Sequence, residues 1–209
     1  MTTPQRAKFL DGELMGHVAV MSFSASVGLL SMFAVDFVDL YFISLLGDIA
    51  KTAGVGFAGT LIFFNMSISI GLMIAVSALA ARRLGRHDPA GAREIATNAL
   101  ALGLMVSSVF AVLFWVFTPQ LLDLIGATGD AKTYATRYLR IVVPSMPVAV
   151  VAMSCGGLLR AHGDARRAML ATVGGGAVNA VLVPILIFGL SLGLEGAAMA
   201  SVAARGGLA

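Results

Sequence analysis

The sequence alternates long apolar runs with short polar connections. A helix needs about 20 mostly apolar residues to cross a membrane. Five runs reach this length, and a sixth begins near Leu194 and stops at Ala209. We therefore predict six transmembrane helices, over residues 14–46, 53–81, 95–117, 139–159, 168–190 and 194–209. Because the sixth run is short and no polar residues follow it, we expect the chain to be cut within its last helix.

Polar residues mark where these helices begin and end. Asp88 followed by Pro89 is typical of a helix start, because aspartate accepts hydrogen bonds from free backbone amides and proline suits the first helical position. Gly163 predicts a turn in the basic fourth connection. Residues 118–140 are expected to form a longer polar connection, in which Asp130 caps a short helix on the surface.

Composition supports a membrane protein. The 209 residues are 58% hydrophobic and 12% charged, whereas soluble domains carry about 25% charged residues. The net charge of +3 does not suggest a nucleic-acid partner, because the basic residues lie at the ends of the apolar runs. The fold class expected is an all-α membrane protein, a bundle of six transmembrane helices forming one domain over residues 1–209.

The distribution of Lys and Arg predicts the orientation. The N-terminal segment and the even-numbered connections carry nine of these residues, and the opposite side carries four. Cytoplasmic connections are enriched in Lys and Arg. We therefore expect a multi-pass protein of the cytoplasmic (inner) membrane, surrounded by lipid, with its N-terminus in the cytoplasm.

Two carboxylates, Asp36 and Asp39, interrupt the first apolar run. A charged side chain at the bilayer centre costs at least about 2.5–3.5 kcal/mol, so acids there usually line a bundle interior or an ion pathway. The two residues are three apart, so they share a helix face and can titrate as a coupled pair. We predict that they bind the proton or cation of a transporter. The alternative is that Asp39 lies near the outer interface and reaches water.

Amides also occur inside the apolar runs, at Asn65, Asn98 and Asn179. Asn179 follows Gly174–Gly176, a stretch where a second helix could approach closely. It could therefore be a site residue or an interhelical hydrogen-bonding residue. The sequence has no spacing typical of a metal site and no P-loop, nucleotide-binding or hydrolase motif. We expect no enzymatic activity and no cofactor.

Five short motifs follow one another along the chain. They are Phe37-Val38-Asp39 with Phe42–Gly47, Ala81–Gly85, Leu159–Arg166, Val178–Leu182 with Pro184–Gly189, and Gly196–Ala198 with Ala200-Ser201. In this order and at this spacing they resemble the first six-helix lobe of the multidrug and toxic compound extrusion (MATE) family of secondary transporters. The resemblance covers essentially the whole chain.

The resemblance implies two lobes that form a V and open alternately to each side of the membrane. It implies that Asp39 is the family's first-helix acid and that Asn179 belongs to the same cation site, while Ser201 stands where the family often has Thr. The coupling ion would be H+ or Na+. The partners implied are a small organic substrate and a C-terminal lobe that is missing from this chain.

The chain departs from the family pattern at two places. Val183 stands where the family commonly carries an Asp, four residues after the Asn that corresponds to Asn179. Asp36 is an additional acid, and we hypothesise that it restores the number of carboxylates from a different helix. The first helix also lacks the proline often found near its start, with Met21 and Ser22 there instead.

The function expected is secondary active antiport. The transporter would export organic, cationic compounds such as drugs and toxins in exchange for H+ or Na+, with Asp39 and Asp36 as the coupling carboxylates and Asn179 and Ser201 beside them. One alternative is a lipid-linked precursor flippase of the same superfamily. It would favour a strongly basic central cavity, whereas no Lys or Arg lies in the middle of a predicted span before Arg205. The other alternative is a non-transporting membrane scaffold or channel subunit.

Overall fold

The computed structural model describes residues 14–206, and every regular element in that range is helical. The elements are α1 (Leu14–Ser44), α2 (Ile49–Gly85), α3 (Pro89–Leu124), α4 (Gly129–Val142), the 3-10 turn η1 (Val143–Ser145), α5 (Met146–Ala161), α6 (Ala165–Pro184), the π-helical turn η2 (Ile185–Gly189) and α7 (Gly193–Gly206). The predicted all-α class is therefore confirmed.

Five helical segments are long and apolar enough to cross a membrane. They are Val18–Ser44, Ile49–Gly85, Pro89–Leu124, Gly129–Ala161 and Ala165–Gly189. The sixth predicted segment corresponds to α7, which has 14 residues within the described range. Residues 207–209 of that prediction lie outside the described residues.

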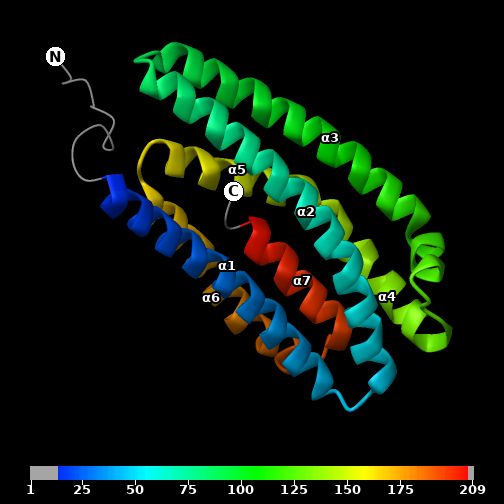
Figure 1. Cartoon of the computed structure of the whole chain (residues 1–209). Helices are drawn as coiled ribbons and strands as arrows, with labels where there is room; N and C mark the ends of the chain where they lie inside the picture. Colours follow the sequence, from blue (N-terminus) through cyan, green and yellow to red (C-terminus); the bar gives the residue numbers. More distant parts are fainter. Residues whose placement is uncertain (1–13, 207–209) are drawn as a thin grey trace.

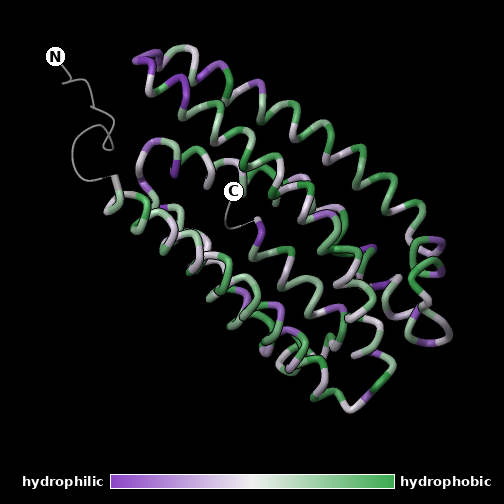
Figure 2. Tube along the Cα trace, viewed as in Figure 1, coloured by the Kyte–Doolittle hydropathy of each residue, from purple (hydrophilic) through white to green (hydrophobic). Residues whose placement is uncertain are grey.

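Side chains at the outer surface of the bundle are those expected to face lipid. Phe23, Phe33 and Phe37 on α1 are exposed, and so are Phe63 on α2 and Val112 on α3. Figure 2 shows the same pattern along the chain, with hydrophilic residues gathered mainly at the helix ends and hydrophobic residues along most of each helix. A surface of this kind is stable only in an apolar environment. The fold is that of a membrane protein.

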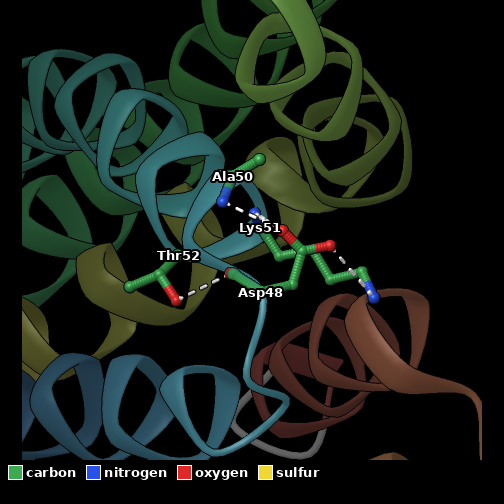
Figure 3. A network of polar contacts seen from close by, with 4 residues as sticks. All are labelled: Asp48, Ala50, Lys51 and Thr52. Atoms are coloured by element: carbon green, nitrogen blue, oxygen red, sulfur yellow. Dashed lines mark hydrogen bonds and ion pairs between the residues drawn. The ribbon is translucent and has the colours of Figure 1, made fainter.

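Aspartates at the helix starts explain why α2 and α3 begin before the apolar runs. Asp48 accepts hydrogen bonds from the backbone amides of Ala50 and Lys51, at 3.0 and 3.3 Å, and a second carboxylate oxygen lies 3.5 Å from the Lys51 ammonium (Figure 3). Asp88 accepts from the amide of Gly91 at 2.9 Å, with Pro89 in the first turn as predicted. Each carboxylate satisfies amides that have no partner within the helix.

The prediction for residues 118–140 is wrong. No long polar connection exists there, because α3 continues to Leu124 and α4 begins at Gly129 after four residues. Asp130 lies in the first turn of α4, and Thr128 is the capping residue. The physical reason is amphipathicity: the buried residues of α4 recur at helical spacing (Ala135, Tyr138, Leu139, Val142), so this polar segment has a core-facing side.

Prolines separate α4 from α5 within one membrane-spanning segment. Pro144 lies in η1 and Pro147 in the first turn of α5, and neither can donate a backbone hydrogen bond. Consequently the predicted fourth helix, 139–159, is in fact a 33-residue segment from Gly129 to Ala161 that is interrupted near its middle. The interruption positions Ser145, which becomes important below.

The helices pack as two groups with α7 between them (Figure 1). Helices α1 and α6 lie side by side, and α2 packs against α3, α4 and α5. The short α7 contacts α1, α4, α5 and α6. As a result, side chains from α1, α6 and α7 can meet in the interior.

Some of this packing requires glycine. A Cβ atom added at Gly54 of α2 would lie 2.8 Å from the backbone oxygen of Ala131 in α4. At Gly56, two residues further along α2, an added Cβ would meet nothing within 4 Å. Close helix contacts of this kind are common in membranes, where small residues let backbones approach each other.

We predict that Gly54→Ala destabilises the protein by about 1–3 kcal/mol, because the backbone of α4 must move to admit the methyl group. The matched variant Gly56→Ala should leave stability unchanged or raise it by up to about 1 kcal/mol, since alanine favours a helix more than glycine does. Thermal unfolding in detergent measures both. Equal melting temperatures for the two variants would contradict the proposed contact.

A second prediction concerns the Asp48 cap, which lies outside the membrane-spanning segments. Partial desolvation acts to raise the pKa of Asp48, but the amides of Lys51 and Ala50 and the Lys51 ammonium together hold that pKa below its usual value. Because the folded-state pKa is the lower one, the stabilisation is present above the unfolded pKa of about 3.9 and is lost as the pH falls through the folded pKa.

Asp48→Ala should therefore melt at a lower temperature than the wild type at neutral pH, and the difference should shrink below about pH 4. Melting curves recorded across the pH range test this expectation. Glu94→Ala is the control, since Glu94 is an exposed helical acid away from any cap. A difference between Asp48→Ala and the wild type that stays constant down to pH 3 would be incompatible with the ionised cap.

Candidate functional site

A buried carboxylate joins three helices. Asp39 of α1 is only 6% exposed. Its Oδ1 accepts a hydrogen bond from Nδ2 of Asn179 on α6 at 2.7 Å, and its Oδ2 accepts one from Oγ of Ser201 on α7 at 3.1 Å. Three of the four residues predicted as a site are thus in direct contact, although they are up to 162 positions apart in the sequence.

Two glycines allow this approach. A Cβ at Gly176 of α6 would lie 2.8 Å from Cγ2 of Val35 on α1. Because Gly176 is three residues before Asn179, the close contact is one turn from the Asn179–Asp39 hydrogen bond. On α7, a Cβ at Gly196 would lie 2.7 Å from the backbone oxygen of Leu186. Small residues therefore bring α6 and α7 within reach of Asp39.

Asp36 lies one helical turn before Asp39 and borders a partly open cavity of about 870 Å³. The cavity is bordered by α1, α2, α5, α6 and α7, and Asp39, Asn179 and Ser201 also line it. Most of the remaining lining is apolar or backbone, including five methionines (Met21, Met32, Met66, Met73, Met153). All four predicted site residues therefore border one space.

The interpretation of Asp39 as an acid that reaches water at the outer interface does not fit this geometry. Its carboxylate is buried against an amide and a hydroxyl, and its access is to the cavity. Val183, at the position where a carboxylate was expected, is fully buried. The cavity's second acid is Asp36, which lies on α1, whereas Val183 lies on α6. This position is compatible with the hypothesis that Asp36 replaces the carboxylate absent at Val183. The coupling role of the four residues stays a prediction.

Three further residues, which the sequence analysis did not identify, adjoin the site. Arg205 of α7 borders the cavity, and its Nη1 donates a hydrogen bond to Oγ of Ser145 at 3.3 Å. Tyr138 of α4 is buried close to Ser201, Asp39 and Arg205. Arg205 was recognisable in the sequence as a residue four positions after Ser201, on the same helix face.

Arg160 requires a correction. The sequence predicts that residues 160–167 form a basic cytoplasmic connection, with no Lys or Arg in the middle of a span before Arg205. In the structure Arg160 lies in the last turn of α5, and its side chain borders the cavity. The guanidinium Nη1 lies 3.4 Å from Sδ of Met73 on α2. The cavity therefore contains two acids and two basic residues.

Comparison with known families agrees with these features. A sequence model of the MatE family matches residues 24–185. The chain belongs to this family. The family match covers Asp36, Asp39 and Asn179, and it ends before Ser201 and Arg205.

Curated relatives of this MatE chain are transporters. It is 27% identical to the multidrug export protein MepA of Staphylococcus haemolyticus over 185 residues, covering 87% of this chain and 40% of the relative. It is also 27% identical to a FAD transporter of Shewanella oneidensis over 186 residues, covering 87% and 41%. The chain thus spans about 40% of the length of these relatives.

Solved transporter structures share the fold. A crystal structure of MATE in the bent conformation superimposes with a TM-score of 0.92 and 28% identity, covering 99% of this chain and 46% of that one. A MOP superfamily transporter from Pyrococcus furiosus gives a TM-score of 0.89 and 29% identity, covering 98% and 45%. The chain corresponds to the N-terminal half of a MATE protein.

The hydrogen bonds at Asp39 predict a stability effect. Asn179→Ala should destabilise the protein by about 1–3 kcal/mol, because one oxygen of a buried carboxylate loses its donor. Asn98→Ala is the matched control, since Asn98 is exposed and should tolerate the change. Thermal unfolding in detergent measures the difference. If both variants melt at the wild-type temperature, the Asp39–Asn179 contact contributes nothing to stability.

Proposed function

We propose that this chain is the N-terminal lobe of a secondary active antiporter. The transporter exports organic, cationic compounds in exchange for H+ or Na+ by alternating access, with its N-terminus in the cytoplasm. Asp39 and Asp36 are the coupling carboxylates, and Asn179 and Ser201 hold Asp39. The single observation that carries this proposal is the buried Asp39 cluster at the wall of an 870 Å³ cavity.

The chemistry of the cluster suits a small cation. The Asp39 carboxylate accepts two hydrogen bonds, and Oδ1 of Asn179 is buried without a hydrogen-bond partner among residues 14–206. A carboxylate can bind a proton, and carboxylate and amide oxygens can both coordinate a cation through their lone pairs. A buried acid in the membrane interior is costly when ionised and unpaired, so it favours a proton or cation at this position.

The cavity suits an organic cargo. Its volume lies within the range of small-molecule sites, about 300–1,000 Å³, and it combines an apolar lining with a few polar groups. Methionine side chains are flexible and polarizable, so the five in the lining can pack around molecules of different shape. The acids at one end attract a positive charge on the cargo.

Coupling follows from competition for the same carboxylates. A cationic cargo and a coupling ion both neutralise Asp36 and Asp39, so binding of one disfavours the other. A ligand shifts a conformational equilibrium only by its differential affinity for the two states. If the ion binds the inward-open and outward-open states unequally, its gradient drives cargo across the membrane in one direction.

The test uses the full-length protein, with both lobes, reconstituted in liposomes with a fluorescent cationic dye. An imposed proton or sodium gradient should drive dye movement in the wild type. Asp39→Asn should reduce this to the level of empty liposomes, because an amide cannot exchange a proton or replace the negative charge. Glu94→Gln, an exposed acid on α3, should retain wild-type transport. Gradient-driven transport by Asp39→Asn at the wild-type rate contradicts the proposal.

Asp36 is tested separately. Asp36→Asn should abolish transport or shift its pH or sodium dependence, because one of the two cavity acids is lost. Applying each gradient alone, in sodium-free buffer for the proton gradient, also identifies the coupling ion. Unchanged transport at every pH and sodium concentration would show that Asp36 does not replace the carboxylate absent at Val183.

The second candidate is a flippase for lipid-linked precursors, favoured by the two arginines at the cavity. Binding measurements distinguish it and the scaffold function from antiport. In weakly buffered solution, a proton-coupled exchanger releases protons when a cationic cargo is added to the purified full-length protein. A scaffold releases no protons under these conditions. A flippase binds a phosphate-bearing lipid instead of the cationic cargo.

A further inference from the structure

Arg160 is a basic residue turned into the cavity. Among the described residues its Nε is buried without a hydrogen-bond partner, and its Nη1 makes one hydrogen bond, to Sδ of Met73 at 3.4 Å. Glycines leave room around the guanidinium: a Cβ at Gly156 of α5 would lie 3.9 Å from Nη1, and one at Gly28 of α1 would lie 4.0 Å from Nη2. The group therefore sits between α1, α2 and α5.

This placement leaves the charge without a counter-ion among residues 14–206. The four ion pairs found within residues 14–206 join Asp48, Asp88, Asp123 and Asp164 to basic residues at helix ends, and none involves Arg160. A thioether is only a weak acceptor. A partly buried guanidinium with such a partner retains most of its capacity to bind a carboxylate or phosphate, which it can do through two parallel hydrogen bonds.

A role in membrane topology does not require this orientation. Arg166 and Arg167, in the first turn of α6 at the same end of the bundle, are exposed and supply positive charge at the surface. Arg160 instead borders the same cavity as the acids. Its side chain contributes to the interior.

The cavity thus has two acids and Arg205 towards one end and Arg160 towards the other. Gly28, beside the Arg160 guanidinium, lies eight residues before Asp36 on α1, which corresponds to about 12 Å of helix rise. An organic molecule of ordinary size can reach across this distance. A cargo with an amine near Asp36 and an acidic group near Arg160 would neutralise both ends.

We propose that Arg160 binds an acidic group of the cargo, a carboxylate or a phosphate, so that the preferred cargo carries both a positive and a negative charge. This inference rests on the proposed function, because it assumes that the cavity holds cargo. It narrows the cargo class from organic cations to molecules that also bear an acidic group. Arg160 is then a specificity-determining residue.

The test compares two forms of one rhodamine dye, the free acid and its methyl ester. The two share the same cationic ring system and differ only in the carboxylate. Full-length protein is placed in phosphatidylcholine nanodiscs, which lack anionic lipid, and each Kd is measured by fluorescence anisotropy. The wild type should bind the free acid about tenfold or more tightly than the ester, as a charge-assisted hydrogen-bonded pair predicts.

Arg160→Gln should remove this preference while changing the ester's Kd by less than about twofold, because only the acidic group loses its partner. Arg166→Gln, which removes an exposed arginine at the same end, should keep the preference. The unchanged ester affinity serves as the check on folding, since a misfolded cavity would lose both dyes.

Three results would overturn the inference. The first is that the wild type binds both dyes equally, and the second is that Arg160→Gln weakens the binding of both dyes equally. The third is that phosphatidylglycerol nanodiscs abolish the wild-type preference, which would assign the Arg160 site to a lipid headgroup. These outcomes are separable from failure of the proposed function. Gradient-driven transport of the ester dye, and its loss in Asp39→Asn, tests antiport independently of Arg160.

Discussion

The structure depends on the need to satisfy one carboxylate inside the membrane. Asp39 lies in the interior of the bundle, where an unpaired ionised acid would be very unfavourable. It is satisfied by an amide from α6 and a hydroxyl from α7, so the last two helices of the chain are joined to the first. Lipid tails provide no hydrophobic force that would hold these helices together, so their association depends on close packing and on interhelical hydrogen bonds such as these.

The same contacts form the wall of the cavity. Close packing at Gly176 and Gly196 brings α6 and α7 near α1 on one side, while the space bordered by α1, α2 and α5 stays open. Tight and open regions therefore adjoin each other within one lobe. A site at this boundary can respond to both a small ion in the packed region and a larger molecule in the open region, as coupled transport requires.

The charges of the cavity are arranged in opposition. Asp36 and Asp39 lie near Arg205, whose guanidinium is held by Ser145 at the interruption between α4 and α5. Arg160 lies towards the other end of α1, beside Gly28 and Met73. This arrangement differs from a purely acidic cavity. The family relationship gives the architecture, and under the proposed function the charges that line the cavity would set its cargo preference.

Much of this protein is determined by its sequence. Apolar runs of about 20 residues or more predict an all-helical membrane fold, since a helix satisfies every backbone group within its own segment and needs about this length to cross. Local chemistry also predicts the Asp88 cap and the turn at Gly163, whose φ is +83°. Asp36, Asp39 and Asn179 stand out as candidates because carboxylates and amides in apolar runs are rare. Ser201 is a candidate only through the resemblance to the MATE family.

Tertiary structure determined the remainder. Composition made residues 118–140 resemble a surface connection, but packing against α2, α3 and α7 buries one face of α4 and makes it part of the bundle. Likewise, the sequence places Arg160 at a helix end without indicating whether it points to solvent or to the interior. Side-chain direction at a helix end depends on the neighbouring residues. Here Gly28 and Gly156 leave room for the guanidinium, and Met73 contacts it.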